Sequence, residues 1–441
     1  MNKEVQFKRI FRLTSKVTDI FPKGGARFLD NLITGSLGNK MLGNYLHQRT
    51  RQRLRKLKQF KNILVVGDLN IGDAIISSMG VSALRKIFPN SEIDFTVKSS
   101  TKVLMEGNPE VSNLYPIYNH APYPTTNDLS RLRNVINNKN YDLIINFCPM
   151  ISSNFFGIKR TISYNLIASE LMKNERIPES INNINYQAYK FIGNALKDFT
   201  PPDFIEAFEG PKIYLSDESV IEAKNFLSNN GIDLDTPLVM LNPDASAVYT
   251  RIPFDFQINL LKKISKLNCN ILIGAGHVEK LIEQRVISNF PPNDYKNIIV
   301  VPPSTELDTY AALIDLSDIF ITGDTGPLHI AAARKFSNRT GKSLRNKTAV
   351  LSIFGSTPPH IYGYDSREKN YIPANQDAPS RTFIAKAACR NISCINKMAK
   401  ACKEVRCFDN LTVNEIYSEI NSHLSTLKRF YFPKERSIFA E

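Results

Sequence analysis

Two carboxylates, Asp68 and Asp73, flank a glycine turn in the stretch NILVVGDLNIGDAIISSMG. An apolar run leads into the turn and a helical pattern follows it, as in many nucleotide-binding loops. Its glycines, however, lack the spacing of a dinucleotide fingerprint, and a carboxylate at a helix N-terminus repels phosphate. Asp73 therefore suits a general base that accepts a proton from a hydroxyl group. The alternative is an ordinary N-cap aspartate.

The stretch ITGDTGPLHIAAA has the features of an anion site. A strand ends, Asp324, Thr325 and Gly326 form the turn, and Pro327 stands where a helix would start. The free amides of the first helical turn, together with the helix dipole, predict a phosphate site, and Thr325 adds a hydroxyl donor. His329 would face the ligand from within the helix. The alternative is a capped helix start, with Asp324 as the N-cap and His329 packed in the core.

A similar turn, ILIGAGHVEK, comes one strand–helix unit earlier. Gly274 and Gly276 open it, and Glu279 lies where a carboxylate binds the hydroxyls of a ribose. A solvated Glu279 is the alternative. The second half of the chain thus offers a nucleotide site and the first half a base. Together they predict transfer of a group from a nucleotide-activated donor to an acceptor hydroxyl.

Four cysteines near the C-terminus, Cys389, Cys394, Cys402 and Cys407, follow the pattern C-x4-C-x7-C-x4-C. Four thiolates fit a tetrahedral Zn or Fe site, although these pairs are wider than the usual C-x2-C. The alternative is a set of reduced thiols that pack a loop beneath the last helix. A structural Zn or Fe ion is therefore one of two interpretations of this cluster.

An alternation of strands and helices must position these groups. From residue 62, the strand patterns NILVVG, EIDFTV and YDLIINF alternate with helical patterns over residues 73–87 and 183–196. This alternation is typical of a mostly parallel sheet with helices on both faces. The polar, proline-containing stretch KDFTPPDFIEAFEGPKI then interrupts it, which indicates a linker between domains.

The alternation resumes after the linker. The strand patterns are PLVMLNP, CNILIGAG, NIIVV, LSDIFITG and TAVLSIFG, and helices are expected over residues 255–267, 278–289 and 412–427. The chain is thus expected to fold into two doubly wound halves. Ligands in such sheets bind outside the carboxyl ends of the strands, so two halves facing each other would hold one substrate on each wall of a cleft.

Composition limits the functional classes. The chain has 441 residues, of which 42% are hydrophobic and 22% charged, as is typical of a soluble globular protein. This length suggests about two or three domains. No run approaches the ~20 apolar residues of a membrane-spanning helix, and the N-terminus lacks the apolar core of a secretory signal. A cytoplasmic location is therefore expected.

Basic residues are concentrated at the N-terminus. Residues 1–60 contain 14 Lys or Arg against three carboxylates, a net charge of +11 out of +14 for the whole chain. Phe7, Ile10 and Phe11 recur there at helical spacing, and a second basic block, RTRQRLRKLK, follows. Such a segment suits the anionic inner face of the cytoplasmic membrane, and a solvated helical extension is the alternative. Nucleic acid is not expected as a partner, because the other residues are almost neutral.

The motifs and their order resemble one family. NILVVGDLNIGDAIISSMGVSALRKIFPNSEIDFTV resembles the opening of glycosyltransferase family 9, the ADP-heptose:lipopolysaccharide heptosyltransferases. GDTGPLHIAAA is similar to its D-T-G-x-x-H-x-x-A-A signature, SIFGSTPPH to its F-G-x-T-x-P segment, and GAGHVEK to its glycine–glutamate turn. CFDNLTVNEI is similar to the family's C-terminal segment. The matches keep the family's order between residues 62 and 425.

The resemblance implies a GT-B fold, two Rossmann-like domains facing a cleft, and inverting sugar transfer that requires no metal or other cofactor. Asp73 would be the base that deprotonates the acceptor hydroxyl. The donor, expected to be ADP-heptose, would rest its diphosphate on the backbone amides of Thr325, Gly326 and Leu328. The other expected donor contacts are Asp324 and His329 near the sugar, Glu279 on the ribose, and residues 301–304 beside the adenine.

The chain departs from the family at one donor-binding position. Family members usually have a Lys-Arg-Trp-Pro or Lys-His-Trp-Pro run after PGAS, and its lysine contacts the donor. Here the sequence is NPDASAVYTRIPFD, with Thr250 at the place of the lysine and Arg251 next to it. The resemblance therefore implies that Arg251 supplies the charge that stabilises the leaving diphosphate. Arg and Lys differ in geometry, so another nucleotide sugar or a loss of activity is the alternative.

The resemblance thus implies a bacterial cell-envelope enzyme that transfers heptose to a lipid-anchored saccharide acceptor in lipopolysaccharide or related glycoconjugate assembly. Two alternatives stay open: a heptosyltransferase of autotransporter-type proteins with a cysteine-bound metal, and a catalytically impaired GT-B binding protein. The expected parts are a basic amphipathic extension (1–60), an acceptor-binding domain (61–200), a linker (201–213), a nucleotide-sugar-binding domain (214–388), a cysteine-containing loop with a closing helix (389–428) and a tail (429–441).

Overall fold

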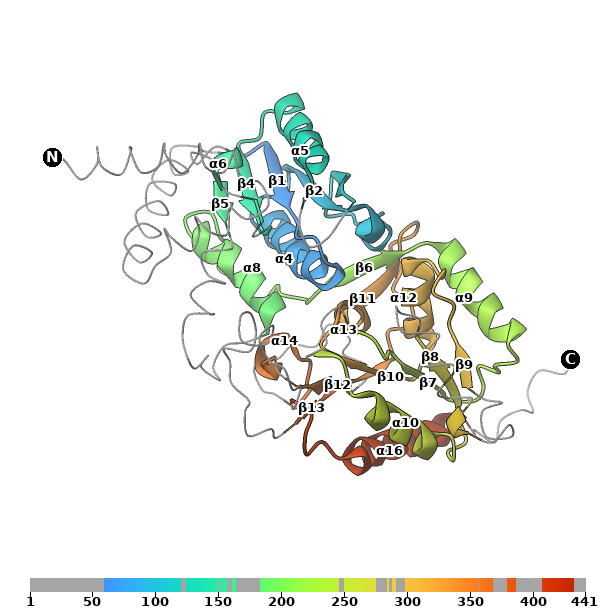
Figure 1. Cartoon of the computed structure of the whole chain (residues 1–441). Helices are drawn as coiled ribbons and strands as arrows, with labels where there is room; N and C mark the ends of the chain where they lie inside the picture. The colour runs from blue at the N-terminus through green and yellow to red at the C-terminus, as the bar shows by residue number, and fades with distance from the viewer. Residues whose placement is uncertain are drawn as a thin grey trace, which may run out of the picture. The chain divides into compact units, whose positions relative to one another are not determined.

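The computed structural model describes residues 59–119, 124–148, 150–151, 153–156, 161–163, 183–245, 250–274, 284, 288–290, 298–355, 357–367, 379–385 and 407–431. The chain divides into two compact units. Unit 1 comprises Met1–Ile177 and Ile184–Pro211, and unit 2 comprises Pro178–Asn183 and Lys212–Glu441. Each unit is built on its own parallel sheet (Figure 1).

Unit 1 contains a five-stranded parallel sheet in the order β3-β2-β1-β4-β5. Its strands are β1 (Asn62–Val66), β2 (Glu92–Lys98), β3 (Asn113–Tyr118), β4 (Leu143–Asn146) and β5 (Thr161–Ser163). Its helices are α4 (Ile71–Ile87), η1 (Ser99–Leu104), α5 (Thr126–Asn138), α6 (Ser153–Phe156) and α8 (Ile184–Ala195). The central strands β1 and β4 are buried on both faces, which explains their uninterrupted apolar sequences.

The β1–α4 turn is the part of unit 1 that carries the predicted chemistry. The strands predicted from NILVVG, EIDFTV and YDLIINF are confirmed as β1, β2 and β4. The helix predicted from residue 73 begins at Ile71, because Asn70, in an extended conformation, is its N-cap. Gly67 lets the turn pass close to β2, since a Cβ atom there would lie 2.5 Å from Thr96 O.

The boundary between the two units, from Pro211 to Lys212, lies within the stretch expected as a linker (201–213). Residues 201–211 belong to unit 1, where Phe204 and Phe208 are buried. The Phe204 ring stacks on Tyr189 of α8 with 4.3 Å between ring centroids. Lys212 starts strand β6 of unit 2. The aromatic residues of the stretch, buried against α8, outweigh its polar and proline-rich composition.

Unit 2 contains a six-stranded parallel sheet in the order β13-β12-β10-β7-β8-β9. Its strands are β7 (Leu238–Leu241), β8 (Asn270–Ile273), β9 (Ile298–Val300), β10 (Ile319–Gly323), β12 (Ala349–Phe354) and β13 (Arg381–Ile384). A separate parallel pair joins β6 (Lys212–Leu215) to β11 (Arg334–Ser337). The helices are α9 (Asp217–Asn229), α10 (Phe254–Ile264), α12 (Leu307–Leu316), α13 (Gly326–Ala332), α14 (Pro359–Tyr362) and α16 (Val413–Tyr431). The five strands predicted for this half are confirmed.

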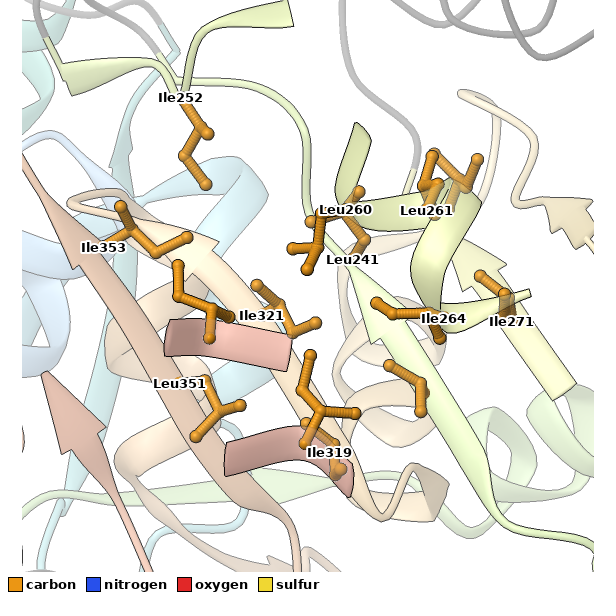
Figure 2. Packing of buried hydrophobic residues seen from close by; sticks show 14 of the residues in the cluster. Leu241, Ile252, Leu260, Leu261, Ile264, Ile271, Ile319, Ile321, Leu351 and Ile353 are labelled. Atoms are coloured by element: carbon orange, nitrogen blue, oxygen red, sulfur yellow. The ribbon is translucent and has the colours of Figure 1, made fainter. Parts of the chain in front are cut away.

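The core of unit 2 lies between its sheet and the helices α10 and α16 (Figure 1). Figure 2 shows leucine and isoleucine side chains of the sheet, such as Ile321 and Leu351, packed together with those of α10. From α16, Ile416, Ile420 and Leu424 recur every fourth residue and are buried in the same cluster. The final helix predicted over residues 412–427 is therefore an integral part of unit 2. Among the described residues, no helix is long and apolar enough to cross a membrane.

Both sheets follow the same connection rule. From the central strand β1 the chain adds β2 and β3 on one side and then returns to add β4 and β5 on the other. From β7 it likewise adds β8 and β9, then β10, β12 and β13. These two Rossmann-like sheets confirm the α/β fold class expected of a GT-B protein. Ligands in such sheets bind where the order reverses, which is at the carboxyl ends of β1 and β4 and of β7 and β10.

Candidate active site

The β1–α4 turn places Asp73 in the first turn of α4. Asn70 is the N-cap and Ile71 the first helical residue, so the alternative in which Asp73 caps the helix is wrong. The Asp73 Oδ2 atom instead accepts a hydrogen bond from Asn70 Nδ2 at 2.9 Å. This contact orients a partly exposed carboxylate at the switch point of unit 1, the position that a base for a bound hydroxyl requires.

Both carboxyl groups of the turn have raised pKa values. Burial raises the pKa of Asp73, because desolvation disfavours its charged form, while the hydrogen bond from Asn70 opposes the shift. The pKa of Asp68 lies well above its usual range, through burial first and the negative charge of Asp73 second. A base with a raised pKa accepts a proton more readily than an ordinary aspartate.

Asp68 joins the turn to the end of β4. Its Oδ1 accepts a hydrogen bond from Leu69 N at 2.7 Å. Its own amide donates to Ser77 Oγ at 3.2 Å, and that hydroxyl donates to the Asp73 carbonyl at 2.7 Å. Cys148, just after β4, contacts the Asp68 carboxyl group. Sequence reasoning missed Cys148, because nothing in the local pattern brings it to this turn.

In unit 2, the turn after β10 has the predicted location but a different cap. α13 begins at Gly326 with Thr325 as its N-cap, so the alternative in which Asp324 caps the helix is wrong. Leu328 N donates to Thr325 O at 3.1 Å, so this amide is already used inside the helix. The amides of Thr325 and Gly326 stay the candidates for a diphosphate. α13 has only seven residues, so its dipole is smaller than that of a longer helix.

α13 is held in place by two buried side chains. His329 is 5% exposed, and its Nδ1 lies 2.8 Å from Tyr364 Oη. Burial lowers the pKa of His329 to about 4, so the ring is neutral at physiological pH. After the helix, Lys335 Nζ donates to the carbonyls of Ala331 and Ala333, each at 2.8 Å. His329 is thus packed as the alternative had it, and its contact with the donor stays a prediction.

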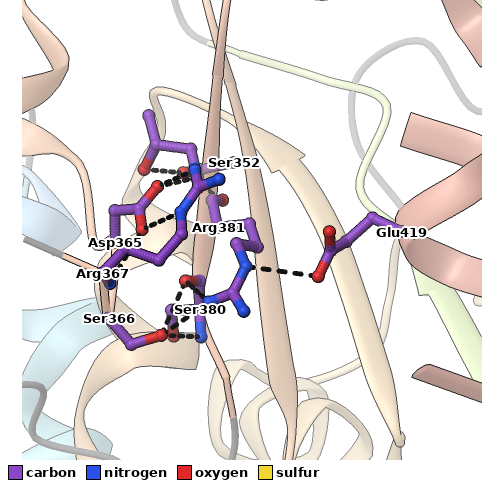
Figure 3. A network of polar contacts seen from close by, with 8 residues as sticks. Ser352, Asp365, Ser366, Arg367, Ser380, Arg381 and Glu419 are labelled. Carbon is purple, nitrogen blue, oxygen red and sulfur yellow. Dashed lines mark hydrogen bonds and ion pairs between the residues drawn. The ribbon is translucent and has the colours of Figure 1, made fainter. Parts of the chain in front are cut away.

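Tyr364, the partner of His329, lies in the loop after α14. A polar network fixes this loop (Figure 3). Arg367 Nε donates to Asp365 Oδ1 at 2.8 Å, and Thr382 N donates to Asp365 Oδ2 at 3.0 Å. From the same strand, β13, Arg381 Nε lies 3.2 Å from Glu419 Oε1 of α16. The network therefore ties the loop after α14 to β13 and α16.

The loop between β7 and α10 carries the residues at the place of the family's lysine. Arg251 Nη2 lies 2.8 Å from Asp244 Oδ1 and donates to Ala245 O at 3.0 Å. Thr250 is 8% exposed, and its carbonyl lies against Gly323, where a Cβ atom would come within 2.6 Å. Arg251 keeps 31% of its side chain exposed. The Arg251 guanidinium thus lies in the expected loop, where it pairs with Asp244 of the same loop.

Two side chains that sequence reasoning missed hold this loop at its base. Gln257 Nε2 donates to the carbonyls of Pro243 and Ile252, at 3.0 and 2.7 Å, and so ties its two ends together. Asn242 contacts Tyr310 and the end of β10. Its partners lie 68 and 80 residues away in sequence. The sequence held one signal for Asn242, since it is a polar residue directly after the buried strand β7.

The remaining predicted residues are only partly covered by the described ranges. Gly274 follows β8 and is buried, and residues 301–304 follow β9. Cys407 is half-buried. Within the described parts of the chain, no group of three or more His, Cys, Asp and Glu side chains could hold a metal ion. The predicted residues outside these ranges are Gly276, Glu279, Cys389, Cys394 and Cys402, together with residues 1–58 of the extension.

A comparison with known proteins supports the family resemblance. Residues 203–386 match glycosyltransferase family 9 (heptosyltransferase). This part of the chain thus resembles glycosyltransferase family 9. This match supports a glycosyltransferase, as the sequence predicted. A glycosyltransferase of Haemophilus influenzae is 22% identical over 283 residues, which cover 62% of this chain and 80% of that protein.

Solved structures of family 9 proteins share the fold. A family 9 glycosyl transferase from Veillonella parvula has a TM-score of 0.62 at 18% identity, covering 83% of this chain and 98% of its own. The ADP-heptose lipopolysaccharide heptosyltransferase II of E. coli has a TM-score of 0.58 at 16% identity, covering 83% and 99%. The E. coli heptosyltransferase WaaC with ADP has a TM-score of 0.50 at 14% identity, covering 82% and 99%.

Proposed function

We propose that this chain is a family 9 enzyme that transfers heptose from ADP-heptose to a hydroxyl group of a lipid-anchored saccharide, in lipopolysaccharide or related glycoconjugate assembly. The observation that carries the proposal is the Asp73 carboxylate, held by Asn70 at the switch point of unit 1 with a raised pKa. The choice of donor is supported by the similarity to the ADP-heptose lipopolysaccharide heptosyltransferase II of E. coli and to WaaC, which was solved with ADP.

The proposed reaction is a single displacement with inversion at the anomeric carbon. Asp73 takes the proton of the acceptor hydroxyl as its oxygen attacks that carbon. The bond from the carbon to the diphosphate oxygen breaks, and the nucleoside diphosphate leaves with the electron pair. The amides of Thr325 and Gly326 and the Arg251 guanidinium stabilise the charge on the leaving group, so no metal ion is needed.

We also propose that residues 1–60 bring the enzyme to the anionic inner face of the cytoplasmic membrane. The support is their net charge of +11. Basic residues near an anionic bilayer contribute about 1 kcal/mol each, and salt screens the attraction. The acceptor is anchored in lipid under this proposal, so the extension would concentrate the enzyme at its substrate.

A nucleotide-sugar screen with the purified full chain tests the function. ADP-heptose, GDP-mannose, UDP-glucose and UDP-N-acetylglucosamine are each offered with a deacylated lipopolysaccharide core acceptor, with and without EDTA. We expect transfer from ADP-heptose that EDTA does not change and that Asp73→Asn abolishes. Transfer from a uridine donor alone would show that the donor assignment is wrong. Nucleotide binding without any transfer would favour the catalytically impaired binding protein instead.

A further inference from the structure

The stretch between α13 and β12, residues 334–347, concentrates positive charge. Its sequence, RKFSNRTGKSLRNK, contains six Lys or Arg and no Asp or Glu. The whole chain carries +14, and residues 1–60 account for +11 of it, so residues 61–441 carry +3. Without residues 334–347, this part of the chain would carry −3. Its near neutrality is therefore an average over one strongly basic stretch and a slightly acidic remainder.

Two of the six cations are used inside the fold. Lys335 is fully buried, and its Nζ donates to two carbonyls at the end of α13. Arg345 forms an ion pair with Asp318 and donates to two carbonyls at the end of α12. The four others form no ion pair with any described residue: Arg334, Arg339, Lys342 and Lys347. Their charge is therefore not neutralised within the part of the chain that the structure describes.

Backbone hydrogen bonds fold this stretch into a hairpin, which we call the basic hairpin. Ser337 N donates to Lys342 O at 2.8 Å, and Leu344 N donates to Lys335 O at 2.9 Å. At the base, the Asn346 side chain accepts from Lys335 N at 2.7 Å and donates to Lys335 O at 2.8 Å. The first arm, β11, also pairs with β6. The backbone that carries the cations is thus ordered before any partner binds, which lowers the entropic cost of binding.

The tip of the basic hairpin extends into solvent. Residues 339–343 are all exposed. Gly341, in the turn, has a φ of 66°, and a Cβ atom there would meet no described atom within 4 Å. Arg339 and Lys342 belong to this tip, and Lys347 is exposed near the base. Three exposed cations without an ion pair therefore lie on one short, ordered element.

We propose that the basic hairpin is a second surface with which the enzyme contacts an anionic membrane, in addition to the N-terminal extension. The choice of partner rests on the proposed function, which places the acceptor in a lipid bilayer. Each basic residue near an anionic bilayer strengthens binding about fivefold. The hairpin has fewer exposed cations than the extension has basic residues, so it adds to the attachment and does not replace it.

The composition of the basic hairpin favours a lipid surface over other anionic partners. Single-stranded nucleic acids need exposed aromatic rings on which bases stack. The one aromatic residue of the hairpin, Phe336, stacks on Tyr214, and Arg334 lies over its ring. The centre of a protein–protein interface needs apolar side chains, and residues 338–343, NRTGKS, have none. A charged bilayer surface requires neither feature, because the attraction is electrostatic.

Vesicle binding of the full chain tests the surface. The hairpin variant combines Arg339→Gln, Lys342→Gln and Lys347→Gln. A control variant removes three exposed lysines elsewhere in the chain: Lys197→Gln, Lys224→Gln and Lys266→Gln. On vesicles of phosphatidylglycerol and phosphatidylcholine at low salt, the hairpin variant should bind about 10- to 100-fold more weakly than the wild type. The control variant should lose only about twofold, because charges far from the bilayer are screened.

Chemical acetylation of wild-type lysines locates the contact. Mass spectrometry of peptides gives the acetylation rate at each lysine, with and without vesicles. Phosphatidylglycerol vesicles should slow the reaction at Lys342 and Lys347 severalfold and leave Lys224 unchanged. Vesicles of phosphatidylcholine alone should change none of these rates. Equal protection of all three lysines would contradict a contact made by the basic hairpin.

The outcomes separate this surface from the proposed function. If the hairpin and control variants bind phosphatidylglycerol vesicles equally, the surface is wrong and the proposed transfer stands. If the hairpin variant loses affinity for single-stranded RNA and not for vesicles, the partner is nucleic acid and the membrane assignment is wrong. Transfer to a soluble acceptor should be the same in the wild type and both variants. A wild type that binds vesicles through the hairpin but transfers no sugar would disprove the function alone.

Discussion

Arg251 and Asp244 form an ion pair inside one loop of unit 2, with Nη2 and Oδ1 2.8 Å apart. The positive charge assigned to the leaving diphosphate is therefore partly neutralised by the protein itself. The pair is partly exposed, and pairs of this kind contribute about 0–1 kcal/mol. A diphosphate carries more charge than one carboxylate, so it can compete for the guanidinium. The acid also restricts where the guanidinium lies.

Removal of the cation should damage donor use more than removal of the acid. Arg251→Ala should lower kcat/KM for the nucleotide sugar about 10- to 100-fold, because charge on the leaving group is less stabilised. Asp244→Asn keeps an oxygen to orient the guanidinium and removes the competing charge, so ADP should bind as tightly as in the wild type or tighter. Steady-state kinetics and calorimetry measure both. An unaffected Arg251→Ala enzyme would assign the charge to another residue.

The two aspartates of the β1–α4 turn should have different effects on catalysis. Asp73→Asn should cut transfer about 10²- to 10⁴-fold, the usual contribution of a positioned base, with the Kd for ADP unchanged. Asp68→Asn should keep most of the activity. The rate should rise with pH through the raised pKa of Asp73. This acid limb should persist in Asp68→Asn, because Asp73 is still present as the base. A limb that disappears in Asp68→Asn would make Asp68 the base.

The raised pKa of Asp68 also predicts a gain in stability on its replacement. The folded state binds the Asp68 proton more tightly than the unfolded chain does. The protonated Asp68 carboxyl group therefore contributes its full stabilisation of the folded state at low pH. This stabilisation is lost as pH rises through the pKa of Asp68 in the folded state. Asp68→Asn should therefore raise the midpoint of thermal unfolding at pH 8, by about 2–4 °C for each kcal/mol regained, and change it little at pH 4. An equal change at both pH values would contradict a buried titrating carboxyl group.

Membrane attachment and catalysis should be separable at a defined position. Phe60 is buried, with its ring centroid 4.9 Å from that of Phe88 and 5.4 Å from that of Phe199. A chain that begins at residue 59 keeps this cluster. It should fold, bind ADP as the full chain does, and use a soluble acceptor fragment equally well. It should lose most binding to phosphatidylglycerol vesicles and most activity on a lipid-anchored acceptor.

Two controls accompany the truncation. A chain that begins at residue 62 lacks Phe60 and should unfold at a lower temperature, whereas its loss of vesicle binding should be the same. Raising the salt concentration should release the full chain from vesicles, because screening weakens the attraction. If the chain that begins at residue 59 fails to fold or to bind ADP, residues 1–58 are a structural part of unit 1 and the membrane proposal is wrong.

The four-cysteine cluster makes a prediction that is independent of catalysis. The protein purified anaerobically should contain about one Zn or Fe ion per chain, the content of a tetrahedral thiolate site. A Cys389→Ser, Cys394→Ser double variant should lose the metal and melt at a lower temperature, while its transfer rate at 25 °C should change little. Metal-free wild-type protein with four titratable thiols would support the alternative of packed, reduced cysteines.

Sequence reasoning succeeded where burial alone determines the pattern. Strands such as β1 and β7 are covered on both faces, so their sequences are continuous apolar runs. Strand β3, with the sequence NLYPIY, was missed because it is a half-exposed edge strand that contains a proline. The β6–β11 pair was missed because it joins Lys212–Leu215 to Arg334–Ser337, a pairing that no local window contains.

The candidate site likewise has parts that the sequence predicted and parts that it did not. Asp73 and the turn that begins with Asp324 could be placed from the sequence, because a strand, a turn and a helix leave recognisable residues at fixed spacing. The hydrogen bonds that fix them could not. Asn242 contacts residues of α12 and β10, and the pairing of Arg251 depends on how one loop closes on itself. Such contacts follow from tertiary packing, which a single sequence does not display.

The buried ionisable groups around α13 have a physiological consequence. Burial lowers the pKa of His329 to about 4, and burial, opposed by Asp315, lowers that of Lys335 to about 8. Both side chains therefore keep a constant charge between about pH 5 and 7. The carboxyl pair of unit 1, by contrast, gains protons as pH falls. Under the proposed mechanism, a fall in pH would therefore slow transfer through Asp73 while the charges around α13 stay the same.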